Sequence, residues 1–241
     1  MGIFDFLSGS PEKRIKSLQK KITEKYGPPE NRQKALDQLI EMGSPEAIGA
    51  LVMRFTVNTE PSITDADEKE YTYKSILEFG EKAVGPVEAF LRRRDVATSW
   101  AVRMLSQLIP ETDLVSLLID VLEKLGPEYT RDPEKKTVLL STLGEHKDER
   151  IPPALIPFLE DPSDDVRIAA AVALGKQNDE RAREPLLKAF VESSDRARVI
   201  AAITTTLADT GFGVQGFREK VEKGLPDGFF VDRSGVVKRR E

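Results

Sequence analysis

The clearest structural signal in this chain is the segment Asp161-Pro-Ser-Asp-Asp-Val-Arg-Ile-Ala-Ala-Ala-Val-Ala-Leu-Gly175. Its apolar residues recur at helical spacing, as on one face of an amphipathic helix. They are Val166, Ala169, Ala170, Val172 and Leu174. Because alanine side chains are small, a neighbouring helix can approach this one closely. The segment therefore predicts a helix that packs tightly against other helices.

The same pattern recurs along the chain. Leu143-Gly144 aligns with Leu174-Gly175, and Asp148-Glu149-Arg150 aligns with Asp179-Glu180-Arg181, both at a shift of 31 residues. Recurrence at such a period is the signature of stacked helical repeats, because one helix pair cannot bury its apolar faces alone. Five pairs are clear and a sixth is degraded, at roughly residues 28–56, 66–93, 96–125, 132–160, 162–192 and 194–224.

Glycines mark the expected turn between the two helices of a pair. Gly43, Gly80, Gly144 and Gly175 each follow a predicted first helix. Glycine tolerates the left-handed conformation that ends a helix, so we expect these residues to be helix terminators. Ser44 followed by proline is a typical start for a second helix.

Residues 161–175 resemble the HEAT-like repeat of the type also found in phycobilin lyases. The resemblance is most specific over residues 132–205 and weaker over residues 28–125. It implies an all-α solenoid, an armadillo-type superhelix of about five to six helix pairs. In that family the second helices line the concave face and commonly bind partners.

We divide the chain into an N-terminal basic amphipathic helix (1–26), the repeat solenoid (27–224) and a C-terminal tail (225–241). In the tail, two apolar runs flank residues 232–235, which predicts a short β-hairpin. We expect it to fold over the last helices, with Phe229 and Phe230 covering exposed core. An arm that pairs with another chain is the alternative.

The N-terminal helix allows two interpretations. Ser10 is a suitable cap, and Ile15, Leu18 and Ile22 form a narrow apolar stripe. The helix can cap the first repeat, as terminal repeats require. Alternatively, it docks on an acidic partner or a lipid surface. The docking residues would then be Phe4, Phe6, Lys13, Arg14, Lys20 and Lys21.

Composition narrows the function classes. The chain has 36 basic and 41 acidic residues, a net charge of −5 that argues against general nucleic-acid binding. It has no cysteine, no signal-like N-terminus and no apolar run long enough to span a membrane. These features are typical of a cytoplasmic protein.

Few residues in the sequence are candidates for catalysis or for metal binding. His146 is the only histidine and falls in a predicted surface turn. The acidic residues Asp65, Asp67, Glu68 and Glu70 lack the glycine and the spacing of a calcium loop, so we expect them to cap a helix that starts near Asp67. The sequence therefore indicates no catalytic residue, metal or cofactor.

Arginines allow two further interpretations. The run at residues 92–94, with Trp100 and Arg103 nearby, suits a helix C-terminus or, alternatively, a nucleic-acid contact. Four arginines recur at repeat spacing together with aspartates, and we expect them to form hydrogen bonds between repeats. They are Arg150, Arg167, Arg181 and Arg198.

Projection of the repeat predicts a partner-binding surface on the second helices, formed by Arg92, Asp120, Pro153, Pro157, Glu184 and Lys188. Pro157 lies inside a helical pattern, where we expect it to bend the helix. The leading hypothesis is a non-catalytic scaffold that binds another protein through this surface. The alternatives are a chromophore-handling enzyme of the phycobilin-lyase type, by resemblance, and a nucleic-acid-binding protein.

Overall fold

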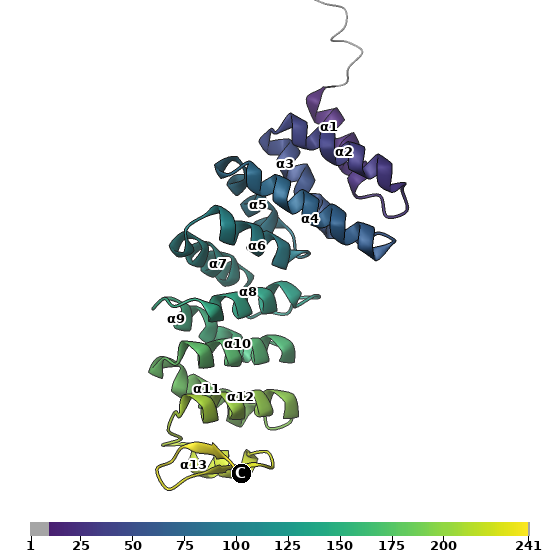
Figure 1. Ribbon diagram of the computed structural model, residues 1–241. Coiled ribbons are helices and arrows are strands. Elements are labelled where there is room, and N and C mark those ends of the chain that lie inside the picture. Colours follow the sequence, from purple (N-terminus) through teal and green to yellow (C-terminus); the bar gives the residue numbers. More distant parts are fainter. Residues whose placement is uncertain (1–9, 241) are drawn as a thin grey trace, which may run out of the picture. The chain divides into compact units, whose positions relative to one another are not determined.

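The computed structural model describes residues 10–240 and shows an all-α solenoid with a small C-terminal hairpin (Figure 1). The chain divides after Leu114 into two compact units. The predicted helix pairs are all present, within a few residues of their expected bounds. No helix in the described part of the chain is long and apolar enough to cross a membrane.

The first unit contains a single helix and two complete pairs, followed by the first helix of a third pair. Its elements are α1 (Pro11–Ile22), α2 (Pro29–Met42), α3 (Pro45–Val52), η2 (Met53–Thr56), α4 (Ser62–Glu78), α5 (Glu81–Arg93) and α6 (Thr98–Leu108). The next helix, α7 (Glu111–Leu125), crosses the boundary between the units.

The second unit contains three further pairs and the hairpin. Its elements are α8 (Glu134–Glu145), α9 (Ile151–Leu155), η3 (Ile156–Glu160), α10 (Asp164–Gln177), η4 (Glu180–Ala182), α11 (Arg183–Glu192), α12 (Ala197–Thr210), α13 (Arg218–Gly224), β1 (Phe229–Val231) and β2 (Val237–Arg239).

Each unit is built in two layers. In the second unit the first helices α8, α10 and α12 pack side by side, while α9 with η3, α11 and α13 form the other layer (Figure 1). In the first unit α4 contacts both α2 and α6 in one layer, and α3 packs on α5 in the other. The core lies between the layers and consists mainly of leucine, alanine, isoleucine and valine.

Helix α1 packs on α2 and α3 as a cap would. Ser10 accepts a hydrogen bond from the backbone N–H of Lys13, and Ile15, Leu18 and Ile22 are buried as predicted. Burying these three side chains stabilises the helix by several kcal/mol, at about 1.5–3 kcal/mol each.

The expected role of the glycines is correct for only two of the four. Gly43 and Gly80 have positive φ angles of 52° and 56° and lie at helix ends. Gly144 and Gly175 instead lie inside α8 and α10. The left-handed residue that ends α10 is Asn178.

Close packing explains the two glycines inside helices. A Cβ atom on Gly144 would lie 2.9 Å from the Cβ atom of Ala173, and one on Gly175 would lie 2.8 Å from Cγ2 of Thr206. Both contacts are with the first helix of the following repeat. Glycine at this position therefore sets how closely successive first helices approach.

The repeated arginines connect successive repeats as predicted. Arg150 donates 2.9 Å to Oγ of Ser116, and Arg181 donates 2.9 Å to the backbone carbonyl of Glu149. Each of these two arginines is also paired with the aspartate two residues before it. The remaining two arginines bond to Ser193 and Asp165.

A buried ion pair holds the turn before α10. Lys136 Nζ lies 2.7 Å from Asp161 Oδ2, and both side chains are almost fully buried. Lys136 also donates to the carbonyl oxygen of Glu128, and the other Asp161 oxygen accepts from the N–H of Ser163. Asp161 thus fastens α8 to the start of the next repeat.

The hairpin is present, but its apolar contacts differ from the prediction. Strands β1 and β2 are antiparallel, and β2 packs on α12. Val237 is fully buried, whereas Phe230 is exposed and Phe229 is only partly covered. In alternating strands only one face can point inward, and here that face includes Val237.

We expect Gly144→Ala to lower the midpoint of thermal unfolding, followed by circular dichroism. The added methyl would overlap the Ala173 backbone, and overpacking costs about 1–3 kcal/mol. Gly49→Ala in α3 is the matched control, because no atom outside its own helix turn lies within 4 Å of its Cβ position. That variant should raise the midpoint, since alanine favours helices by about 0.5–1 kcal/mol. Equal effects of the two changes would contradict this account.

Candidate partner-binding face

The second-helix layer of the second unit presents a row of exposed residues. Pro153, Pro157, Glu184 and Lys188 are all exposed there, as the repeat projection predicts. Pro153 lies in the first turn of α9, where no backbone N–H is needed. Pro157, where a bend was expected, lies in the first turn of the 3₁₀ segment η3, and the α-helical part ends at Leu155.

Two open pockets flank α11 on this layer. The smaller, of about 170 Å³, lies between η3 and α11. The larger, of about 370 Å³, lies between α11, α12 and α13. The first is lined by Ile156, Leu159, Glu160, Pro185, Lys188 and Ala189. The second is lined by Phe190, Val191, Ser194, Ile200, Lys220, Lys223 and Gly224.

Glu184 and Lys188 form an ion pair of 2.8 Å along the exposed side of α11. The hydrogen bond from Lys188 holds the pKa of Glu184 below its usual value and raises the pKa of Lys188 itself. Both groups are therefore charged near neutral pH, and they form a neutral polar ridge on α11.

Arg92 and Asp120 belong to other parts of the chain. Arg92 is exposed on α5 in the first unit and pairs with Glu88 at 2.8 Å. Asp120, on α7, pairs with Lys124 at 3.0 Å. Neither residue lines the two pockets beside α11.

The proposed N-terminal docking residues are described only in part. Lys13, Arg14, Lys20 and Lys21 are exposed on α1, and Arg14 donates to the side chain of Gln38 at 3.3 Å. Phe4 and Phe6 lie outside the described residues. The packing of α1 on α2 and α3 agrees with the capping interpretation, and docking stays a prediction.

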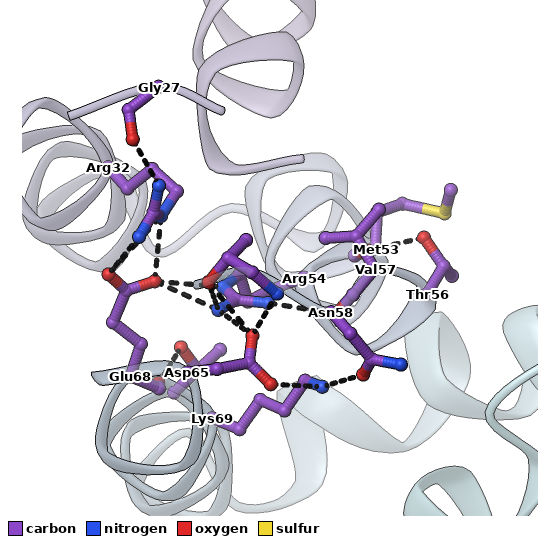
Figure 2. Close-up of polar contacts among 12 residues, drawn as sticks. Gly27, Arg32, Met53, Arg54, Thr56, Val57, Asn58, Asp65, Glu68 and Lys69 are labelled. Atoms are coloured by element: carbon purple, nitrogen blue, oxygen red, sulfur yellow. Dashed lines mark hydrogen bonds and ion pairs between the residues drawn. The ribbon is translucent and has the colours of Figure 1, made fainter. Parts of the chain in front are cut away.

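Sequence reasoning missed a buried ionic cluster in the first unit (Figure 2). The Glu68 carboxylate accepts hydrogen bonds from Arg32 at 3.0 Å and from Arg54 at 2.9 Å. Arg54 also donates to Asp65 at 2.6 Å, and Lys69 lies 2.7 Å from the other Asp65 oxygen. Figure 2 shows these side chains converging from α2, η2 and α4.

The cluster corrects the expected role of the acidic segment. Helix α4 begins at Ser62, so Asp65 and Glu68 do not cap a helix near Asp67 but face inward. Burial raises the pKa of Asp65, but hydrogen bonds from Lys69 and Arg54 outweigh that effect and lower it to about 2. One feature of the sequence could have indicated this cluster. Arg32 lies on the same face of α2 as the buried residues Ala35 and Leu39, where a charged side chain needs a buried partner.

The other suggested sites take part in ordinary structure. Trp100 packs on Phe55 at 4.7 Å and on Tyr73 at 6.0 Å between ring centroids, with Arg103 over both Tyr73 and Trp100. His146 directly follows α8, and its carbonyl oxygen accepts a hydrogen bond from the Gln177 side chain at 2.8 Å. Within residues 10–240, no group of three or more histidine, aspartate or glutamate side chains is placed to hold a metal ion.

Residues 122–208 match the family model for HEAT repeats. The match runs from the end of α7 through most of α12 and so includes both layers of the second unit. It supports a HEAT-repeat protein and does not distinguish the phycobilin-lyase type. A comparison with curated proteins found no match. HEAT repeats commonly mediate protein–protein interactions.

We expect Glu68→Gln to destabilise the protein by about 3–5 kcal/mol, because it leaves two buried guanidinium groups without their shared counterion. Urea unfolding followed by circular dichroism measures the change. Glu88→Gln is the control, since it removes one half-exposed ion pair with Arg92 and should cost about 1 kcal/mol or less. A loss of similar size in both variants would contradict the structural role of the cluster.

We expect Asp65→Asn to reduce the loss of stability in acid. The folded-state pKa of about 2 lies below the ordinary 3.8. The ionised group therefore stabilises the fold fully above about pH 5 and loses this effect as the pH falls toward 2. The shift corresponds to about 2 kcal/mol.

Urea titrations between neutral pH and about pH 3 test this expectation. The variant should be less stable at neutral pH, and its free energy of unfolding should fall less steeply in acid. Asp209→Asn, which alters only the exposed pair with Arg239, should keep the wild-type slope. An unchanged slope in Asp65→Asn would refute the assignment.

Proposed function

We propose that this chain is a non-catalytic adaptor that binds a protein partner along the second-helix layer of its second unit. The supporting observation is the pair of open pockets on either side of α11. Together they give an apolar floor with a charged rim, which is the usual anatomy of a protein-binding surface.

The size of this face limits the kind of partner contact. Helix α11 has ten residues and is about 15 Å long, and packed helices lie about 8–10 Å apart. Three second helices therefore present a face of roughly 15 by 30 Å. That area suits a peptide segment or one helix of a partner rather than a large domain interface.

The structure favours this function over nucleic-acid binding. Trp100 and Arg103, the residues suggested for base stacking, pack on one another and on Tyr73 in the first unit. Neither lies on the face proposed here.

Site-specific photo-crosslinking tests the proposal. We expect p-benzoylphenylalanine in place of Lys188 or Pro157 to crosslink one discrete protein in cells of the source organism, identified by mass spectrometry. The same group in place of Lys34, an exposed residue of α2, is the control and should not capture it. Equal capture at all three positions, or a small molecule in place of a protein, would count against the adaptor function.

A further inference from the structure

The larger pocket beside α11 has an apolar floor built by close packing. Phe190 and Ile200 are buried beneath it, with 2% and 8% of their surfaces exposed. Gly224 of α13 forms one wall, and a Cβ atom there would lie 3.0 Å from the Phe190 ring. At about 370 Å³ the pocket has room for one large apolar side chain, at the lower end of the range for ligand pockets.

Among the described residues that line this pocket, the charged ones are two lysines, Lys220 and Lys223. Both are exposed, and within residues 10–240 neither ammonium group has a hydrogen bond or an ion pair. Other charges on α13 differ, since Glu222 is paired with Arg218 at 2.8 Å. Glu219 also lies on α13 but does not line the pocket, so the rim has two lysines without an ion pair beside an apolar floor.

The charged residues at the smaller pocket, on the other side of α11, differ from those at the larger one. Its lysine, Lys188, is already paired with Glu184, and Glu160 also lines it. The two pockets are separated by the width of one helix, about 10 Å. In an extended peptide this distance spans about three residues.

We propose that this face binds an acidic peptide segment of the partner protein. One apolar side chain fills the pocket above Phe190, and neighbouring carboxylates pair with Lys220 and Lys223. A second apolar side chain about three residues away reaches the smaller pocket. This inference rests on the adaptor function and adds the chemistry of the partner.

A peptide fits this face better than an anionic lipid does. Between the pockets lies the paired ridge of Glu184 and Lys188, which a hydrocarbon chain would have to cross. Even paired charges lose their hydration when hydrocarbon covers them, and this loss is costly. A peptide crosses the ridge with its backbone N–H and carbonyl groups, which can form hydrogen bonds there.

Selection from a displayed library of random twelve-residue peptides, with the full-length protein as bait, tests this inference. We expect the enriched peptides to combine an aromatic or large aliphatic residue with several acidic ones. Synthetic copies should bind about tenfold or more weakly to the double variant Lys220→Glu/Lys223→Glu. Their affinity for the wild-type protein should fall as salt rises, because the contacts are exposed charge pairs.

The matched control is Lys34→Glu/Lys82→Glu, which makes the same charge change at exposed lysines of the first unit. It should bind the peptides nearly as wild type does. Thermal unfolding confirms that both double variants are folded. A third variant, Val191→Glu, places a negative charge in the pocket lining and should also weaken binding.

Three results would overturn the inference. They are enrichment of peptides without acidic residues, equal binding to both double variants, and capture of vesicles containing anionic phospholipid through the same lysines. Crosslinking of a protein at position 188, together with any of these results, would leave the adaptor function intact and refute only the acidic-peptide chemistry.

Discussion

Close packing between successive first helices is the constraint on which the repeat architecture depends. The helices of one pair cannot bury their own apolar surface, so each pair requires a neighbour. In the second unit the approach is so close at Gly144 and Gly175 that no side chain fits without displacement of the next helix. Residues that differ by one methyl group therefore matter more here than charges on the surface.

Both units contain buried charged side chains that are paired with an opposite charge. Lys136 and Asp161 in the second unit, like Arg32 and Glu68 in the first, are almost fully buried and hydrogen-bonded. Removing such groups from water costs several kcal/mol per ion, and a shared partner recovers most of it. Each pair also joins segments far apart in sequence, so the pairs specify which segments pack together.

The repeats could be predicted because their apolar residues recur at a fixed spacing. The bounds of the pairs, the cap at Ser10 and the change of helix type near Pro157 all follow from local patterns. The roles of Gly144 and Glu68 could not be predicted in this way. They depend on which residue of another helix lies opposite, and one repeat of sequence does not give that information.

The candidate face was predictable only in outline. Exposure of Glu184 and Lys188 follows from helical periodicity, and the structure agrees. The pocket above Phe190 depends on how α13 packs against α11. Helix α13 belongs to the degraded last repeat. Lys220 and Lys223 therefore had no counterpart in the earlier repeats from which their position could be projected.

The two layers of the second unit differ in helix length. Its first helices are 12–14 residues long and contain the small residues that allow close contact. Its second-layer helices are shorter, with five α-helical residues in α9, ten in α11 and seven in α13. Short helices leave gaps that their own side chains do not fill, and the pockets beside α11 lie in those gaps. Under the proposed function, changes on the exposed side of the second layer alter partner choice while the first layer keeps the repeats stacked.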